Sequence, residues 1–259
     1  DDDDDEGGDD NKGTCAAPVH YVDTQLNMEF EKEIKAELAR FTGDKIPVSK
    51  FAKLVPAGRA PSTTTRTEKR GVAVEVPVWD PTKCVECNMC ALACPHAVIR
   101  PFLMTEAEVA AAPGGPLPHK AANGEGGKQG LRFHLQVSAL DCLGCGVCAA
   151  ICPAQCLSMR PLEAVAATEA ANWEYCFHAV PARRDVYAAE TARGSQFVQP
   201  LFEFCGACGG CGEAPYIKLL TQLFGERMIA ACASGCNVAY SFALGSNPYC
   251  TTPEGRGPA

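Results

Sequence analysis

The cysteines of this chain include two runs with the same spacing, C-x2-C-x2-C-x3-C-P. Pro95 follows the first run and Pro153 follows the second, and neither run departs from the pattern. This spacing is typical of paired [4Fe-4S] clusters, in which three close thiolates bind one cluster and the fourth binds the other. The ligand sets are therefore expected to be crossed. The first cluster is assigned to Cys84, Cys87, Cys90 and Cys152, and the second to Cys142, Cys145, Cys148 and Cys94.

Zinc is the alternative metal, because C-x2-C pairs also bind it. A tetrahedral zinc site usually takes its four ligands as two separated pairs, whereas each run here holds four cysteines and ends in Cys-Pro. The doubled run therefore favours clusters. Small residues beside the ligands let backbone N–H groups approach sulfur, where such hydrogen bonds influence the reduction potential. These residues are Ala91, Ala93, Gly144, Gly146 and Ala149.

A third group of cysteines, Cys205, Cys208 and Cys211, lies in the loop CGACGGCGE. Its glycines also suit a phosphate-binding loop, but the sequence has no G-K-[ST] there and no ordinary βαβ pattern before it. Half of a metal site at Cys208 and Cys211 is the preferred interpretation, with Cys236 as the next candidate ligand.

Short strands are expected to position both runs, because residues 72–80 and 131–141 alternate between apolar and polar side chains directly before them. Strand and cysteine loop thus form an internal repeat, with a flexible insertion at 101–130 between the copies. A helix is predicted at 162–178. Further on, the third cysteine loop is expected to lead into a helix that ends at Gly225 and then a buried strand at 227–236.

The segment before the first strand is expected to hold one amphipathic helix and a connector. Residues 28–41 place Phe30, Ile34, Leu38 and Phe41 at helical spacing, with Gly43 after them. Residues 43–71 are rich in Pro, Gly, Thr and Lys, which predicts little regular structure. The opening DDDDDEGGDD is too acidic to fold alone. Because the chain does not begin with Met, we expect it to be a piece of a longer protein.

Composition argues against two classes of partner. The 259 residues carry a formal charge of −8 and contain no basic stretch suited to a nucleic-acid backbone. No apolar run approaches the roughly 20 residues that cross a bilayer. Most of the 17 cysteines are closely spaced and no signal peptide opens the chain. A reducing compartment, the cytoplasm or an organelle matrix, is therefore expected rather than secretion.

Over roughly residues 43–259 the chain resembles pyruvate:ferredoxin (flavodoxin) oxidoreductases, also called pyruvate synthases. The resemblance rests on the stretches GDKIPVSKF, EKRGVAVEVPVWDPTKCVECNMCALACPHAVIRPFL, LDCLGCGVCAAICP, NWEY, GACGGCGEAPYIKLLTQLFGERMI and SGC. It implies an α+β fold, in which a bacterial-type 2[4Fe-4S] ferredoxin-like domain with an insertion precedes the truncated start of an α/β thiamine-diphosphate-binding domain. The expected segments are an acidic tail or linker at 1–27, a helix and connector at 28–71, the ferredoxin-like domain at 72–180, a linker at 181–200 and the truncated domain at 201–259.

The resemblance also implies a function. The intact enzyme would decarboxylate pyruvate oxidatively to acetyl-CoA and CO₂, using coenzyme A, and would pass electrons to ferredoxin or flavodoxin. This chain would be its electron relay, inactive alone, and the full-length protein would be a homodimer. Cys208, Cys211 and Cys236 would be three ligands of a third [4Fe-4S] cluster, close to thiamine diphosphate and Mg²⁺, with the fourth ligand outside this sequence. Glu213 would be a neighbour of thiamine, although an acidic residue at a helix start is also ordinary.

Two alternatives stay open: a stand-alone two-cluster ferredoxin and the iron-sulfur subunit of another 2-oxoacid oxidoreductase. The GACGGCGE segment counts against the first. Asn237 and Val238 stand where the family has a small polar pair, which weakens the expected contacts near thiamine. Trp79 and Trp173 are interpreted as core or domain-contact residues. The other cysteines are interpreted as buried or incidental thiols, and the histidines as surface or packing residues: Cys15, Cys156, Cys176, Cys205, Cys232, Cys250, His20, His96, His119, His134 and His178.

Overall fold

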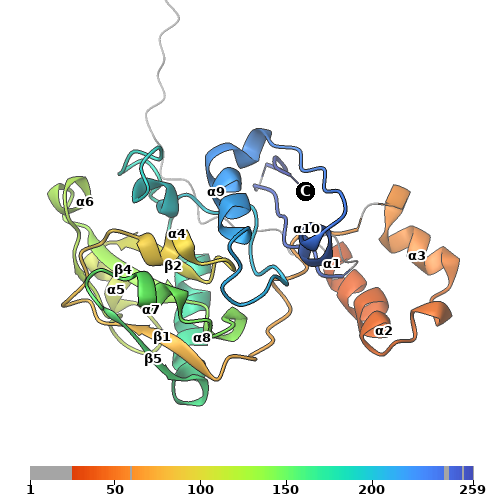
Figure 1. The fold of residues 1–259 in the computed structure, drawn as a ribbon, viewed down its shortest axis with the longest axis horizontal. Coiled ribbons are helices and arrows are strands. Elements are labelled where there is room, and N and C mark those ends of the chain that lie inside the picture. The colour runs from red at the N-terminus through yellow and green to blue at the C-terminus, as the bar shows by residue number, and fades with distance from the viewer. Residues whose placement is uncertain (1–24, 59, 242–244, 253, 259) are drawn as a thin grey trace, which may run out of the picture.

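The computed structural model describes residues 25–58, 60–241, 245–252 and 254–258. A lobe of mixed helix and sheet lies at the left of Figure 1, the N-terminal helices lie at the right, and α9 with the segment after it lies between them. Most of the acidic opening, for which a tail is predicted, lies outside the described residues.

Two copies of one unit build the left-hand lobe: strand, cysteine loop, short helix, strand. The predicted strands before the two cysteine runs are confirmed, as β1 and β4. The first copy consists of β1 (Glu75–Trp79), α4 (Met89–Ala93) and β2 (Ile99–Met104), and the second of β4 (Arg132–Val137), α7 (Val147–Ile151) and β5 (Leu157–Pro161).

The strands of one copy pair with the strands of the other. β1 lies antiparallel to β5, with Trp79 opposite Leu157, and β2 lies antiparallel to β4, with Ile99 opposite Val137. The short β3 (Lys120–Ala121) pairs with the other edge of β4. Helices α4 and α7 also contact each other. Both sheets therefore need both copies.

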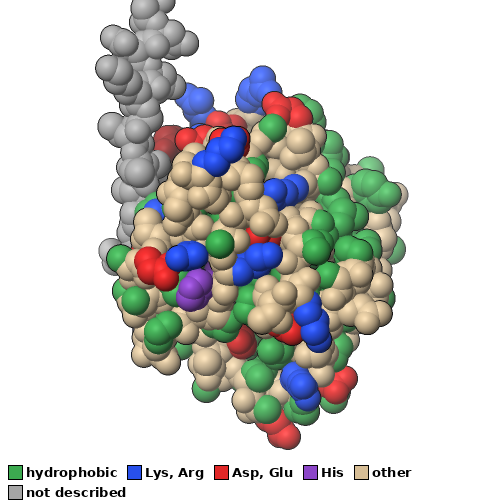
Figure 2. All heavy atoms as spheres, turned by 90° about the vertical axis from the view of Figure 1, so that its left-hand side faces the viewer, with side chains coloured by type: hydrophobic (Ala, Val, Ile, Leu, Met, Phe, Trp, Pro, Cys, Tyr) green, Lys and Arg blue, Asp and Glu red, His purple; other side chains and the backbone are tan. Residues whose placement is uncertain are grey.

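The core of this lobe lies between the sheets and the long helix α8 (Leu162–Ala179), which confirms the helix predicted at 162–178. Trp79 and Trp173 are buried, as expected, and the Trp79 ring meets the edge of Phe133 at 5.7 Å between centroids. All of β4 except its first residue is buried, because elements cover both faces. By contrast, ion pairs such as Lys128 with Glu125 are exposed. Figure 2 shows basic, acidic and apolar side chains interspersed on this side, where pairs of that kind add little stability.

The insertion between the two copies is ordered, so the prediction of a flexible segment at 101–130 is wrong. It contains the end of β2, helix α5 (Glu106–Ala110), β3 and helix α6 (Glu125–Lys128). A capping box starts α5: the Thr105 hydroxyl accepts from the Glu108 N–H, and the Glu108 carboxylate accepts from the Thr105 N–H. These two bonds satisfy donors that a helix start would otherwise leave unpaired.

The N-terminal helix runs from Gln25 to Ala39, as α1 (Gln25–Phe30), a π-helical turn at Glu31–Lys35 and α2 (Ala36–Ala39). Phe30 and Ile34 are fully buried, as the helical spacing predicts. Phe41 is 95% exposed, so its expected place on the buried face is wrong. The helix has already ended there, and Phe41 has a left-handed backbone with φ 57°.

The connector at 43–71 also differs from the prediction, because it contains the helix α3 (Val48–Leu54). Pro47 precedes the helix, where a missing N–H costs nothing. Leu54 is buried against Phe30 and Ile34. Packing on the N-terminal helix thus stabilises a segment whose composition indicated a loop.

The described residues after 200 form helices and irregular backbone. The predicted helix is confirmed as α9 (Ala214–Phe224), with Gly225 after it. The predicted buried strand at 227–236 is wrong: Ile229 is 92% exposed, and α10 (Cys236–Ser241) begins where the strand should end. A strand is stable only beside a partner, and among the described residues this segment has none.

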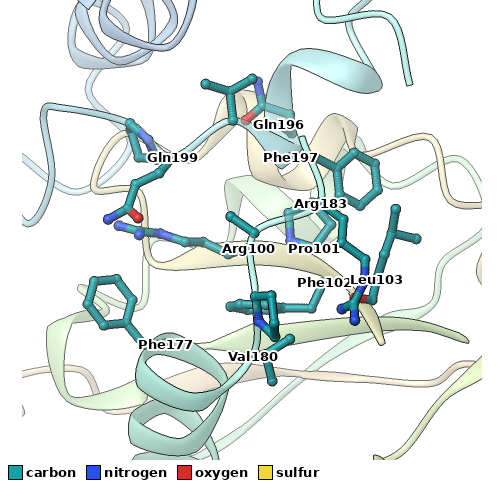
Figure 3. Close-up of a pocket in the computed structure, with 14 residues that line it drawn as sticks. Arg100, Pro101, Phe102, Leu103, Phe177, Val180, Arg183, Gln196, Phe197 and Gln199 are labelled. Atoms are coloured by element: carbon teal, nitrogen blue, oxygen red, sulfur yellow. The ribbon is translucent and has the colours of Figure 1, made fainter. Parts of the chain in front are cut away.

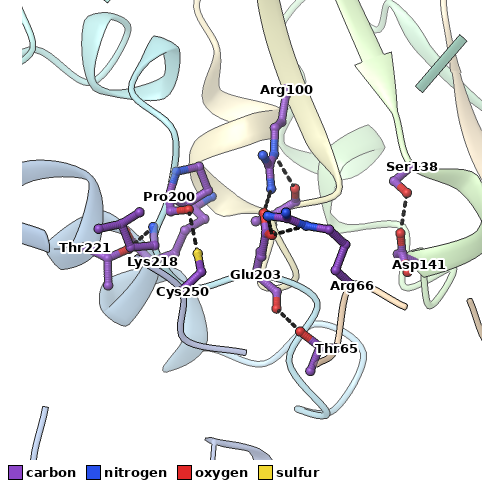
Figure 4. A network of polar contacts seen from close by, with 12 residues as sticks. Thr65, Arg66, Arg100, Ser138, Asp141, Pro200, Glu203, Lys218, Thr221 and Cys250 are labelled. Carbon is purple, nitrogen blue, oxygen red and sulfur yellow. Dashed lines mark hydrogen bonds and ion pairs between the residues drawn. The ribbon is translucent and has the colours of Figure 1, made fainter. Parts of the chain in front are cut away.

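A buried charged cluster joins three distant segments (Figure 4). The Glu203 carboxylate is fully buried and pairs with the guanidinium groups of Arg66 and Arg100. The Thr65 hydroxyl donates to the Glu203 carbonyl oxygen at 2.9 Å. Both guanidinium groups also lie over the Phe177 ring, at 4.8 and 5.4 Å from its centroid. The connector, the ferredoxin-like lobe and the C-terminal segment are therefore fixed together.

Candidate functional site

The two cysteine loops have the same backbone conformation at equivalent positions. Two and four residues after the first cysteine, φ is positive, at Glu86 (58°) and Asn88 (59°) in one loop and at Gly144 (68°) and Gly146 (76°) in the other. The N–H of the residue two positions on points at the first sulfur of each loop, at 3.4 Å in both. Left-handed residues turn the chain tightly, and three thiols of the first loop line the same pocket.

Gly144 is required at its position for a second reason. A Cβ there would lie 2.8 Å from the Glu75 carbonyl oxygen, which is too close for any side chain to fit without movement. The first loop has Glu86 at the equivalent position. Glu86 is buried, and because a left-handed backbone is unfavourable for a non-glycine residue, contacts elsewhere must hold it.

Those contacts come from the insertion and from the linker after α8. The Glu86 carboxylate pairs with Arg193 at 2.8 Å and Lys120 at 3.4 Å, and accepts from the Asn123 N–H at 2.9 Å. Lys120 also donates to the Cys84 carbonyl oxygen at 2.6 Å. The insertion therefore holds the first cysteine loop in shape, a role that its composition did not reveal.

The four thiols assigned to the first cluster line one pocket, together with Phe133, Leu135 and Cys156. Three of them come from the first run and Cys152 comes from the second, as the crossed assignment requires. The Cys156 sulfur lies 3.4 Å from the Cys152 sulfur, and the Cys156 N–H donates to that sulfur at 3.4 Å. The position of Cys156 outside both runs did not distinguish it from incidental thiols.

The four thiols assigned to the second cluster influence one another electrostatically. Burial raises the pKa of the Cys148 thiol to about 12, and the charges of Cys94, Cys142 and Cys145 add to the rise. Burial also raises the pKa of Cys142 to about 11, although the hydrogen bond from the Gly144 N–H lowers that pKa in part. Neighbouring buried thiolates repel one another, whereas iron bound between them would stabilise the ionised form. This donor set therefore fits a cationic iron centre.

The third cysteine group lies directly against the second loop. A methyl group in place of the Gly209 hydrogen would lie 3.3 Å from the Cys145 Cβ, so the loop at 208–211 touches the Cys145 side chain. Cys208 is exposed and Cys211 half-buried. Cys236 is exposed at the start of α10, and among the described residues no hydrogen bond joins its sulfur to Cys208 or Cys211.

His96, treated as a packing residue in the sequence analysis, connects the two regions. It follows Cys94 and Pro95, is buried, and contacts two backbone carbonyl oxygens of the third group: Nδ1 lies 3.0 Å from that of Cys205, and Nε2 lies 3.3 Å from that of Cys208. Burial lowers the pKa of His96, although both carbonyl oxygens oppose this. Cys94, which is assigned to the second site, is thus separated from the third group by two residues and one hydrogen bond.

Glu213 is exposed just before α9, at the position that caps the helix. No group of three or more His, Cys, Asp or Glu side chains in the described part of the chain has the arrangement of a single-ion site.

A separate pocket lies between β2, the end of α8 and the turn at Gly194–Phe197 (Figure 3). Arg100, Phe102, Phe177 and Phe197 are among its lining residues, and none of the described residues that line it is a cysteine.

Comparison with known proteins matches residues 83–156 to a family described as a 4Fe-4S dicluster domain, and residues 21–73 to EKR, a domain of unknown function. The chain is 46% identical over 233 residues to pyruvate:ferredoxin oxidoreductase of Moorella thermoacetica, covering 89% of this chain and 19% of that protein. It is 47% identical over 231 residues to pyruvate-flavodoxin oxidoreductase of Enterobacter agglomerans, with 88% and 19% covered. This chain is homologous to one segment of the pyruvate:ferredoxin and pyruvate-flavodoxin oxidoreductases.

The mitochondrial pyruvate dehydrogenase [NADP(+)] of Euglena gracilis is also similar, at 44% identity over 236 residues, with 91% of this chain and 13% of that protein covered. The chain thus spans about a fifth or less of the length of these relatives. The pyruvate oxidoreductase resemblance and the 4Fe-4S dicluster domain are confirmed. Of the helices in the described residues, none combines the length and apolar character needed to span a membrane.

Proposed function

We propose that this chain is the electron-relay part of a pyruvate:ferredoxin or pyruvate-flavodoxin oxidoreductase. The observation that carries the proposal is the pocket lined by Cys84, Cys87, Cys90 and Cys152, in which two separate cysteine runs supply one set of thiols. When bound, a [4Fe-4S] cluster accepts and releases single electrons. The chain contributes the thiolates, their burial and the N–H groups directed at sulfur.

We assign Cys142, Cys145, Cys148 and Cys94 to the second cluster, and Cys208, Cys211 and Cys236 to three ligands of a third. The contact of Gly209 with Cys145 supports an order in which the second site lies between the third and the first. The His96 bridge from Cys94 to the third group supports the same order. Electrons from pyruvate would then leave through the first site.

The remaining machinery is part of the same proposal. Thiamine diphosphate, Mg²⁺, pyruvate and coenzyme A would bind mainly to parts of the enzyme outside this sequence, with Glu213 as the neighbour of thiamine contributed here. The residues from 201 onward would belong to that thiamine domain, and those at 72–180 would form the relay domain. Ferredoxin or flavodoxin would receive the electrons, in a homodimeric enzyme of the cytoplasm or an organelle matrix. The mitochondrial relative from Euglena is consistent with an organelle.

Anaerobic reconstitution of the chain with iron and sulfide tests the relay. We expect two interacting [4Fe-4S]⁺ signals in the electron paramagnetic resonance (EPR) spectrum after reduction with dithionite. Zinc bound at the cysteines, without these signals, would contradict the proposal. A stand-alone ferredoxin would give the same two signals but would need no third group. If a Cys208→Ser, Cys211→Ser double variant of the full-length protein contains less iron than the unmodified protein, the stand-alone ferredoxin is excluded.

Pairs of variants test the crossed assignment. Cys94→Ala and Cys148→Ala should each lose the second cluster and keep the first. The EPR spectra and midpoint potentials of these two variants should therefore agree. Cys90→Ala and Cys152→Ala should each lose the first cluster and keep the second. Their EPR spectra and midpoint potentials should agree with each other. Cys90 and Cys94 lie on or next to the same helix, α4. Identical surviving spectra for Cys90→Ala and Cys94→Ala would therefore contradict crossing.

A further inference from the structure

Lys218 is a buried cation at the contact between α9 and the helix of the first cysteine run. Its side chain is 1% exposed, although it lies on a helix of the C-terminal segment. The ammonium group donates to the carbonyl oxygens of Ala91, Leu92 and Cys94, the last two at 3.0 and 3.1 Å. These carbonyls belong to the last turn of α4 and the residue after it, where a helix leaves acceptors unpaired.

No carboxylate in the described part of the chain forms an ion pair with Lys218. A charge taken out of water is strongly unfavourable unless an opposite charge or several hydrogen bonds compensate for it. Three carbonyl dipoles supply part of that compensation. Burial lowers the pKa of Lys218 to about 8, while the thiolates of Cys94, Cys90 and Cys205 oppose this and Arg100 reinforces it.

The position of α4 indicates which anions would compensate for the buried charge of Lys218. Cys90 lies in this helix and is assigned to the first cluster, and Cys94 follows the helix and is assigned to the second. Cluster-bound thiolates carry negative charge, and reduction adds one electron to each centre. The Lys218 ammonium therefore lies beside groups from both assigned sites, in surroundings where water screens charge poorly.

We propose that Lys218 is a positioning residue that fixes α4 against α9 and, as the buried counter-charge of the clusters bound through Cys90 and Cys94, raises their reduction potentials. The inference rests on the proposed relay function and deepens it. A positive charge stabilises the reduced, more negative state of a neighbouring centre. The same three hydrogen bonds join the helix that follows the third cysteine group to the helix of the first run.

Three variants separate charge from hydrogen bonding, measured by EPR-monitored redox titration of the reconstituted chain. Lys218→Gln keeps N–H donors without the charge, Lys218→Met removes both, and Lys218→Arg keeps the charge. We expect the Gln and Met variants to shift the midpoint potential of at least one cluster to more negative values, and the Arg variant to stay closest to the unmodified chain. Lys83→Met is the matched control: it removes the same charge next to Cys84, but its side chain is 63% exposed, so solvent screening should leave the potentials unchanged.

Unchanged potentials in fully loaded Gln and Met variants would overturn the inference, as would loss of iron from all three variants. If the Gln and Met variants lose iron while the Arg variant keeps it, the requirement for a buried positive charge is supported. If the unmodified chain itself takes up no iron-sulfur cluster, the relay proposal fails instead.

Discussion

The sulfur atoms of Cys152 and Cys156 lie 3.4 Å apart, inside the pocket assigned to the first cluster. This distance is longer than the roughly 2.05 Å of a disulfide, so the two thiols are neighbours without a disulfide bond. Only Cys152 belongs to a run with the cluster spacing. The pair therefore offers a test of how well spacing distinguishes a ligand from an adjacent thiol.

We expect Cys156→Ala to retain the iron of both clusters and Cys152→Ala to lose that of the first. The reason is that Cys152 completes a set of four, whereas Cys156 contributes its N–H, which the alanine variant keeps. Iron and acid-labile sulfide per chain, measured after anaerobic desalting, check this. Equal iron loss in both variants would mean that the two thiols share the ligand role.

Glu203→Gln should reduce the free energy of unfolding by about 3–5 kcal/mol, the usual result of breaking a buried ion pair from one side. The substitution leaves Arg66 and Arg100 without their anion. Denaturant unfolding followed by circular dichroism measures the change. Glu37→Gln, which removes an exposed pair with Arg40, is the control and should leave stability unchanged. A Glu203 variant as stable as the control would show that other contacts hold the three segments together.

The same carboxylate makes stability depend on pH. Burial raises the pKa of Glu203, but the charges of Arg66 and Arg100 outweigh it, and the pKa lies below the ordinary value. A carboxyl group with a lowered pKa adds stability above its unfolded pKa of about 4.3, and that stability is lost as pH falls through the folded value. Unfolding free energies measured from pH 7 downward should therefore fall more steeply for the unmodified chain than for Glu203→Gln. Parallel curves would contradict this origin.

Glu86→Gln should weaken the first site, because the Glu86 carboxylate holds the loop between Cys84 and Cys87. Substitution of a residue that supports metal ligands in this way typically reduces the metal affinity by about 10–100-fold. We expect iron loss to a chelator to be about tenfold faster, followed by the decay of visible absorbance. Glu125→Gln, an exposed position in the insertion that also supplies Lys120 and Asn123, serves as the control. Equal rates for both variants would remove Glu86 from the support of the loop.

The features that could be predicted from sequence are those encoded locally. The cysteine runs, β1, β4, α8 and α9 all follow from spacing or periodicity within about 20 residues. The crossed ligand sets stay a prediction, which depends on the repeat of the four-cysteine run. The proposed order of the sites could not be derived this way, because it depends on how close Gly209 lies to Cys145.

The misses have a common physical origin in contacts between distant residues. Lys218 bonds to carbonyls more than 120 residues away, and a lysine among leucines indicates an exposed position by itself. Instead, Leu220 is 46% exposed and Lys218 is buried. The composition of the insertion indicated flexibility, because it does not show that Lys120 contacts Glu86 and the Cys84 carbonyl oxygen. The strand expected at 227–236 failed for the opposite reason, since its apolar residues have no partner strand among those described.

The pairing of β1 with β5 and of β2 with β4 has a consequence for how the relay is assembled. Each half of the repeat exchanges strands with the other, and each would complete the other's set of thiols. Neither half can finish its sheet or fill its site alone, so folding and cluster insertion are linked processes. Loss of one centre would then loosen the scaffold of its neighbour, so a variant that lacks one cluster should hold the remaining cluster less firmly than the unmodified chain does.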